Sequence, residues 1–134
     1  MQTKNFTFLL LSVLIIATVG CSDKVPMRGK VTFSDDGAPL TAGQVTFQSD
    51  TILARGYLKP DGTYILGTDK ETDGIPKGTY NVYLLHTTVY ETPPGGGSPI
   101  EKQQVSRKYA SGETSELTCT VNGKTVFDFT VEKP

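Results

Sequence analysis

Residues 117–121 read Leu-Thr-Cys-Thr-Val, and this alternation of apolar and polar side chains is typical of a β-strand that buries one face. Cys119 falls on the apolar face, so we expect it to be a thiol of the protein core. The same period of two recurs in Val31 and Phe33, in Val45 and Phe47, in Tyr80, Val82 and Leu84, and in Phe127, Phe129 and Val131. Since no period of 3.6 residues persists after Cys21, the sequence predicts an all-β fold.

Short segments with the chemistry of tight turns separate these alternating stretches. They are Asp35-Asp36-Gly37, Pro60-Asp61-Gly62 and Asn122-Gly123, and each contains residues that adopt positive φ at low cost. Asn-Gly between two alternating stretches is a strong hairpin signal, so we expect a hairpin turn at residues 122–123. About seven short strands separated by such turns predict an antiparallel β-sandwich.

The N-terminal residues have the anatomy of a cleaved secretion signal. Lys4 supplies the positive start, an apolar stretch follows from Phe6 to Ala17, and a small residue, Gly20, precedes Cys21. The stretch is shorter than the run of about 20 apolar residues that a membrane-spanning helix needs. We therefore expect residues 1–20 to be a signal peptide that is removed before Cys21.

The residues around Cys21 resemble the lipobox of bacterial lipoproteins. Val19 and Gly20 fit that pattern, whereas Thr18 stands where leucine is usual, so ordinary signal-peptide cleavage remains an alternative. The resemblance implies that Cys21 is the lipid-attachment residue, with a thioether-linked diacylglycerol and an amine acylated by a fatty acid such as palmitate. Two or three acyl chains hold a protein at a membrane without spanning it.

The segment after Cys21 places the domain relative to the membrane. We take residues 21–27 as a linker that reaches about 20 Å when extended, so the domain is expected close to the lipid surface. Ser22 stands where many lipoproteins retained in the inner membrane have aspartate, and this resemblance favours the outer membrane over the inner one. Asp23, one position later, argues the other way.

Length and charge limit the classes of function. The residues that remain after cleavage are enough for one domain with one core. The chain has 13 Lys and Arg residues against 14 Asp and Glu residues. With charges so nearly balanced, neither a nucleic acid nor an anionic surface is indicated as a partner.

The order of strands and turns resembles a known domain family. The stretches that carry the resemblance are Gly29-Lys-Val-Thr-Phe, residues 37–47 and 54–64, and Gly74-Ile-Pro-Lys-Gly-Thr-Tyr-Asn-Val, with Lys108-Tyr-Ala and Phe127-Asp-Phe near the end. They are similar to the carboxypeptidase regulatory-like, or transthyretin-like (prealbumin-like), domain of small envelope lipoproteins, here over residues 28–134. This resemblance implies a β-sandwich with a binding or structural role and no reaction.

Acidic residues and a single histidine offer little basis for metal or catalytic chemistry. Asp69, Glu71 and Asp73, followed by Gly74, match the opening of a calcium loop, but Tyr80 occupies the twelfth position, where such a loop needs glutamate. An acidic surface turn is the favoured interpretation, with a calcium site as the alternative. His86 has no nucleophile or orienting carboxylate nearby in sequence, so we expect no catalytic residue and no cofactor.

One long segment is a candidate binding region. Residues 89–116 include Pro93-Pro-Gly-Gly-Gly-Ser-Pro99 and form a longer connection than compact domains usually contain. The segment is either a tolerated surface insertion or a binding loop, with Tyr90, Arg107 and Tyr109 as its contact residues. Tyr83 and Leu85 make their strand apolar on both faces. The second apolar face is either covered by a loop of this chain or exposed as a contact patch for a partner.

Three hypotheses for function follow. The first is a lipid-anchored, non-catalytic binding or scaffold module that recognises an envelope protein. The second is a structural envelope component that binds cell-wall glycan or polysaccharide. The third, with the least support, is a small hydrolase whose site the sequence does not display. All three place the protein at a membrane through its lipid anchor.

Overall fold

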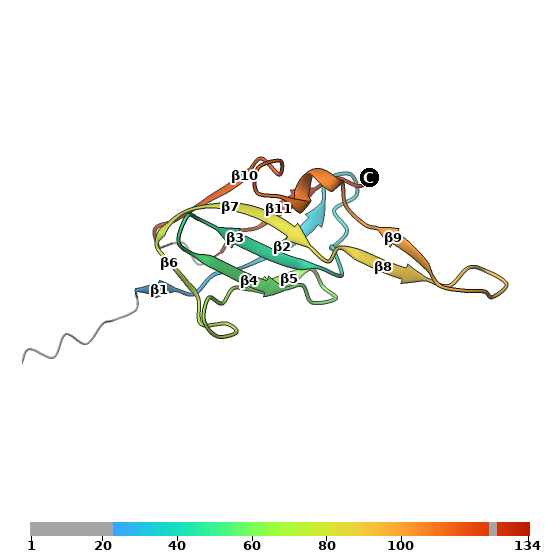
Figure 1. Ribbon diagram of the computed structural model, residues 1–134, viewed down its shortest axis with the longest axis horizontal. Helices are drawn as coiled ribbons and strands as arrows, with labels where there is room; N and C mark the ends of the chain where they lie inside the picture. The colour runs from blue at the N-terminus through green and yellow to red at the C-terminus, as the bar shows by residue number, and fades with distance from the viewer. Residues whose placement is uncertain (1–22, 124–125) are drawn as a thin grey trace, which may run out of the picture.

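Two facing β-sheets form the body of the protein in a computed structural model that describes residues 23–123 and 126–134 (Figure 1). One sheet has four strands, in the order β10 (Leu117–Val121), β7 (Gly78–Leu85), β3 (Gln44–Gln48) and β4 (Leu53–Tyr57). The other has three strands, in the order β11 (Phe129–Val131), β2 (Arg28–Phe33) and β5 (Thr63–Ile65). The all-β sandwich predicted from the sequence is therefore confirmed.

Two small sheets extend the sandwich at opposite ends of its long axis (Figure 1). At one end, β1 (Lys24–Val25) pairs with β6 (Ile75–Pro76). At the other, β8 (Thr88–Glu91) pairs with β9 (Ile100–Gln103), and a short 3₁₀ turn, η1 (Arg107–Ala110), follows. Because β1 begins at Lys24 and Met27 is fully buried, the folded part begins before residue 28, within the segment expected to be a linker.

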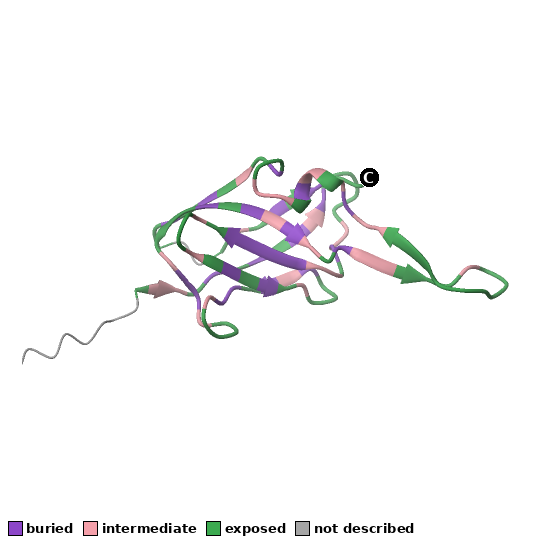
Figure 2. Cartoon of the chain, in the orientation of Figure 1, coloured by how far each residue is buried: buried purple, intermediate pink, exposed green. Residues whose placement is uncertain are grey.

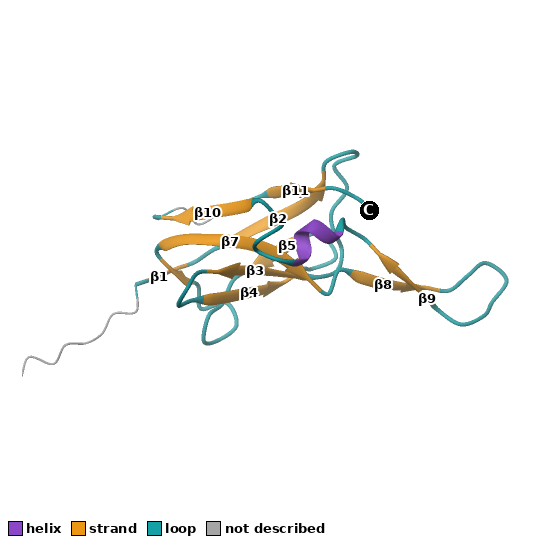
Figure 3. Ribbon diagram, turned by 45° about the horizontal axis from the view of Figure 1, so that its top comes forward, coloured by secondary structure: helices purple, strands orange, loops and turns teal. Residues whose placement is uncertain are grey.

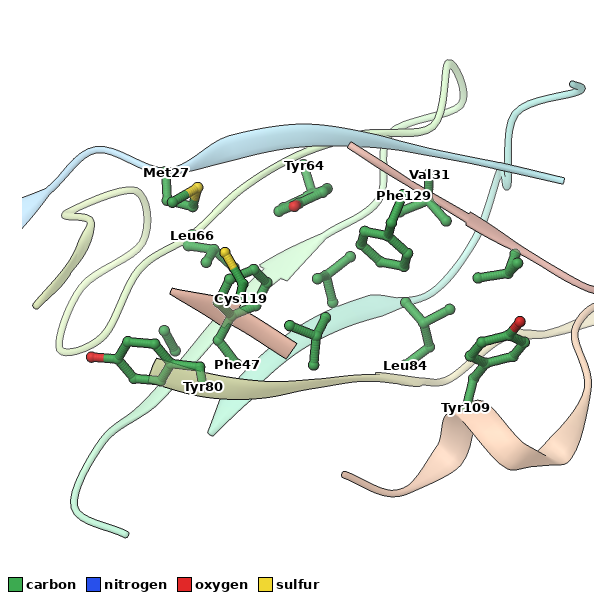
Figure 4. Close-up of a cluster of buried hydrophobic side chains, with 14 of the residues drawn as sticks. Met27, Val31, Phe47, Tyr64, Leu66, Tyr80, Leu84, Tyr109, Cys119 and Phe129 are labelled. Carbon is green, nitrogen blue, oxygen red and sulfur yellow. The ribbon is translucent and has the colours of Figure 1, made fainter. Parts of the chain in front are cut away.

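Buried and exposed residues alternate along several strands (Figure 2), and the buried apolar side chains pack in one cluster between the two main sheets. Figure 4 shows Phe47 and Tyr80 from one sheet facing Tyr64 and Phe129 from the other. Cys119 points into the same cluster and is 7% exposed, so its predicted place in the core is confirmed. Burial of these apolar side chains supplies the main favourable free energy of folding.

The outer face of β7 is covered by the chain that follows η1. A Cβ added to Gly112 would lie 3.2 Å from the Cβ of Asn81 and 3.4 Å from the ring of Tyr83. The Tyr83 hydroxyl donates a hydrogen bond to Gln48 on β3. Tyr83 and Leu85 are accordingly only partly exposed. Of the two interpretations for this doubly apolar strand, the structure supports the covering loop.

Two of the three predicted turns form as expected, and the third does not. Gly37 and Gly62 adopt φ of 71° and 82°, and the Gly62 amide donates to the Lys59 carbonyl across its turn. The predicted hairpin at Asn122-Gly123 is wrong, because β10 and β11 lie in opposite sheets and β11 pairs in parallel with β2. Both strands bury their apolar faces in the same core, but from opposite sides.

A close contact holds the end of the chain against β2. The Phe127 amide donates to the Arg28 carbonyl at 2.9 Å, and the Tyr64 hydroxyl donates to the Phe127 carbonyl. A Cβ on Gly29 would lie 1.9 Å from that carbonyl oxygen, so only glycine allows this approach. Tyr64 is fully buried, and desolvation raises the pKa of its hydroxyl, which stays protonated and able to donate.

Substitution of Tyr64 by phenylalanine tests this contact. Tyr64→Phe removes the donor but keeps the buried ring, so we expect the free energy of unfolding to fall by about 1–2 kcal/mol. Urea denaturation followed by circular dichroism measures the change. Tyr57→Phe is the matched control, because Tyr57 is 66% exposed and its hydroxyl makes no hydrogen bond to a described residue. Equal stability of the two variants would contradict the assigned role of the Tyr64 hydroxyl.

Candidate functional site

The hairpin of β8 and β9 projects beyond the sandwich, and we call residues 88–103 the arm (Figure 3). From the sequence we predicted a long loop over residues 89–116, and the hairpin corrects this prediction. Val89 pairs with Lys102 and Tyr90 pairs with Glu101 in regular antiparallel register. β8, before the Pro- and Gly-rich tip, is rich in β-branched and aromatic residues, which favour strands, whereas β9 contributes only Ile100 of this kind.

The arm exposes large apolar side chains on both of its faces. Tyr90 is 72% exposed and Ile100 is 59% exposed. Because side chains alternate along a strand, Tyr90 lies on one face of the hairpin while Ile100 lies on the other. An ion pair of 3.0 Å between Lys102 and Glu91 borders Ile100. The arm thus offers apolar contact area together with charges that can orient a partner.

Hydrogen bonds fix the arm to the sandwich at its base. The Gln103 side-chain amide donates to the Thr87 hydroxyl at 2.8 Å, and the Gln104 backbone amide donates to the Thr87 carbonyl at 3.2 Å. Thr87 is only 5% exposed, so this attachment lies inside the fold. Toward the tip, Gly95, Gly96 and Gly97 all have positive φ. The arm is therefore held by hydrogen bonds at its base, and glycines with positive φ form a tight turn at its tip.

The three predicted contact residues do not lie together. Tyr90 is on the arm, and Arg107 is exposed at the start of η1. Tyr109 is 4% exposed, and its hydroxyl accepts a hydrogen bond from the Glu132 amide, so its side chain is a core group and not part of a binding surface. Figure 4 shows the Tyr109 ring rising from η1 into the cluster of buried side chains. Ile100 is an exposed apolar residue of the arm that we did not identify from the sequence.

The acidic loop that resembled a calcium site contains a lysine ammonium instead. Lys24 Nζ lies 2.5 Å from Asp69 and 2.7 Å from Asp73, while Glu71 is exposed and takes no part. Across residues 23–123 and 126–134, no group of three or more His, Cys, Asp or Glu side chains is placed to hold a metal ion. The turn is therefore organised by an ion pair between segments far apart in sequence.

This ion pair shifts the pKa values of its members. Hydrogen bonds from Lys24 and then from the Thr68 amide hold the pKa of Asp73 well below its usual value. Hydrogen bonds to Asp69 and Asp73 raise the pKa of Lys24. Both groups are therefore charged at neutral pH. Their contact joins the first folded residues to the 68–73 turn.

The remaining sequence predictions concern chemistry and the membrane. His86 is exposed with φ of 56°, and its ring makes no hydrogen bond to any described residue. Cys21, the predicted lipid-attachment residue, and the signal peptide lie outside the described residues. In the part of the chain that is described, no helix has the length and apolar character needed to span a bilayer.

Comparisons with known proteins give one structural likeness. No protein-family model matches the chain, and no curated protein does so either. The fold is similar to the crystal structure of a DUF3823 family protein from Bacteroides ovatus ATCC 8483, with 19% sequence identity and a TM-score of 0.45. The match covers 82% of this chain and 45% of that one, so this chain spans less than half of that protein. The resemblance to the carboxypeptidase regulatory-like domain stays a prediction.

The Lys24–Asp73 pair predicts how stability depends on pH. Because folding lowers the pKa of Asp73, this residue stabilises the protein above its unfolded pKa, near 3.8, and that stabilisation is lost as the pH falls toward the lowered value. Asp73→Asn keeps an oxygen for the Thr68 amide but loses the charge. We expect the variant to be less stable than the wild type at pH 7, with the difference shrinking below about pH 4. Thermal melts from pH 7 to pH 2 measure it, and a constant difference would contradict the assignment.

Proposed function

We propose that this chain is a lipid-anchored, non-catalytic protein of the bacterial cell envelope whose sandwich presents the arm to a protein partner. The observation that carries the proposal is the position of the arm at the end of the long axis opposite β1 (Figure 1). A lipid at Cys21 would hold the β1 end at the membrane, because Lys24 follows only three positions later. The arm would then point away from the lipid surface.

The surface of the arm suits recognition of a protein. Exposed tyrosine is enriched among the residues that contribute most to protein–protein affinity, and Tyr90 and Ile100 are among the most exposed large apolar side chains described. A two-stranded hairpin also has outer edges whose backbone groups can pair with a strand of the partner. Since isolated hairpins are only marginally stable, a partner that packs on the arm would stabilise it as well.

A binding role fits the polar groups of the described chain better than a catalytic one. The acidic side chains of the 68–73 turn are held by Lys24, and His86 stands alone at the end of β7. Neither arrangement places a nucleophile beside a base that a third group orients.

We also propose that the protein is located at the outer membrane rather than the inner one. Ser22 stands where many lipoproteins retained in the inner membrane have aspartate.

The proposed anchor is tested by Cys21→Ala. We expect the wild-type protein to incorporate labelled palmitate and to sediment with membranes, and the variant to do neither, because the thioether can form only on the cysteine sulfur. Mass spectrometry of the mature N-terminal peptide measures the lipid directly. A wild-type peptide that begins at an unmodified Cys21 would instead establish ordinary signal-peptide cleavage.

The proposed interface is tested by site-specific crosslinking in cells. A photo-crosslinking amino acid at position 90 or 100 should capture one recurrent envelope protein, identified by mass spectrometry. The same group at position 53 is the control, because Leu53 is exposed on β4, away from the arm. In a crosslinked pull-down, Tyr90→Ala combined with Ile100→Ala should reduce the yield of that partner about tenfold or more.

Two results would contradict the arm as the interface. One is capture of the same protein from position 53 as from position 90, since that would indicate proximity without a defined contact. The other is an unchanged yield of the partner with the double alanine variant. Thermal melts of the variant exclude global unfolding as the cause of any loss.

A further inference from the structure

Three adjoining hollows lie along β2, β4 and β5 and reach Val126 and Asp128, which precede β11. Their volumes are about 430, 340 and 480 Å³, and Ile65 borders all three. Arg28 and Thr72 each border two of them, as does Lys59. Because the hollows share these residues, they adjoin one another, and we call the surface that they form the basic groove.

Glycines allow the two sheets to join beneath this groove. The backbone of Arg55 exchanges two hydrogen bonds of 2.9 Å with Gly67, which links β4 to the chain after β5. A Cβ on Gly56 would lie 2.4 Å from the Ile65 carbonyl oxygen. The groove therefore rests on closely packed backbone of two elements, which gives its walls a fixed separation.

The groove gathers positive charge on a chain whose formal net charge is −1. The cationic residues that border it are Arg28, Lys30, Arg55, Lys59 and Lys70. None of them forms an ion pair with a described residue, whereas Lys24, Lys102, Lys108 and Lys133 all do. Among the described cations, only Lys77 and Arg107 share this lack of an ion pair. Most of the described cations that lack an ion pair thus border the basic groove.

Carboxylates at the groove offset only part of this charge. Asp69, Glu71 and Asp128 border it. Asp69 is already paired with Lys24, and Asp128 accepts a hydrogen bond of 2.8 Å from the Lys30 backbone amide. The balance of charge around the groove is therefore positive, and it favours an anionic ligand.

Two further side chains point to the kind of anion. Tyr57 is 66% exposed at the groove, and its strand neighbour Gln44, which also borders the groove, is only 4% exposed. The Gln44 amide makes no hydrogen bond to a described side chain or backbone group, so its donors and acceptor are available to a ligand. An exposed aromatic ring can stack on the apolar face of a sugar ring, and an amide can bond to pairs of hydroxyl groups.

We propose that the basic groove binds an acidic polysaccharide, whose carboxylate groups contact Arg55 and Lys59 while a sugar ring stacks on Tyr57. This site lies apart from the arm and goes beyond the proposed recognition of a protein. The groove is concave and includes an aromatic ring and a buried amide, features that a linear glycan uses. An anionic lipid surface would need only an exposed array of charges.

The test uses the full lipidated protein in non-ionic detergent and measures binding by titration calorimetry. The probes are polygalacturonate oligosaccharides and the same oligosaccharides fully methyl-esterified, which have the same backbone without the charge. We expect esterification to weaken binding about tenfold or more, because charge-assisted hydrogen bonds to Arg and Lys are lost. Monomeric short-chain phosphatidylglycerol serves as the probe for a lipid headgroup.

Matched variants locate the site. Arg55→Gln with Lys59→Gln should weaken polygalacturonate binding about tenfold or more, while Lys77→Gln with Arg107→Gln, an equal change of charge elsewhere, should stay within about twofold. Tyr57→Ala should weaken binding, and Tyr57→Phe should restore it, because stacking needs only the ring. Thermal melts confirm that each variant is folded.

Several outcomes would overturn the proposal. They are an absence of binding to polygalacturonate, equal binding of the esterified form, and equal losses in the two double variants. Tighter binding of phosphatidylglycerol than of polygalacturonate, lost with Arg55→Gln and Lys59→Gln, would reassign the groove to the membrane surface. None of these measurements involves the arm or its partner, so a failure here leaves the proposed protein interface standing.

Discussion

The approach of the Phe127 carbonyl to Gly29 is the contact on which the rest of the sandwich depends. It lets the chain after β10 cross from the four-stranded sheet and lie beside β2, where the Tyr64 hydroxyl donates to the same carbonyl. The crossing brings the Phe127 ring 5.7 Å from Phe47 in an edge-on arrangement, so an aromatic contact joins the two sheets. Without it, β11 has no place beside β2, and the three-stranded sheet loses the strand that carries Phe129.

The period of two along the strands was enough to predict the fold class and the inward side chains. Burial of Cys119 and the turns at Gly37 and Gly62 followed from local chemistry, because each depends on a few adjacent residues. The hairpin expected at Asn122-Gly123 did not form, because the choice of a strand's partner depends on the whole core. β10 completes one wall of that core and β11 completes the other, a fact that no local signal contains.

At the candidate sites, too, local sequence patterns did not predict contacts between distant residues. Tyr90 and Tyr109 are both tyrosines of the 89–116 segment, and both were predicted as contact residues. Tyr90 is 72% exposed, but Tyr109 is only 4% exposed, because η1 turns its ring into the core. Lys24 reaches Asp73 across 49 positions, so a sequence pattern confined to residues 69–74 could not reveal that a lysine fills the turn. The cations of the basic groove come from separate segments, and the nearly neutral composition conceals them. The pairing of β2 with β5 and the hydrogen bonds between Arg55 and Gly67 bring these segments together.

The arrangement of these parts along one axis bears on how strongly each must bind. β1 lies at one end of the molecule and the arm at the other, with β4 and β5 running along the length between them (Figure 1). A protein tethered at β1 would meet membrane-associated partners at an effective concentration set by the tether, so modest affinity at the arm would suffice for stable association. A polymeric ligand along the groove would gain in the same way, because each bound unit holds the next nearby. Modest affinity at the arm and at the groove is therefore compatible with function, provided that the anchor is in place.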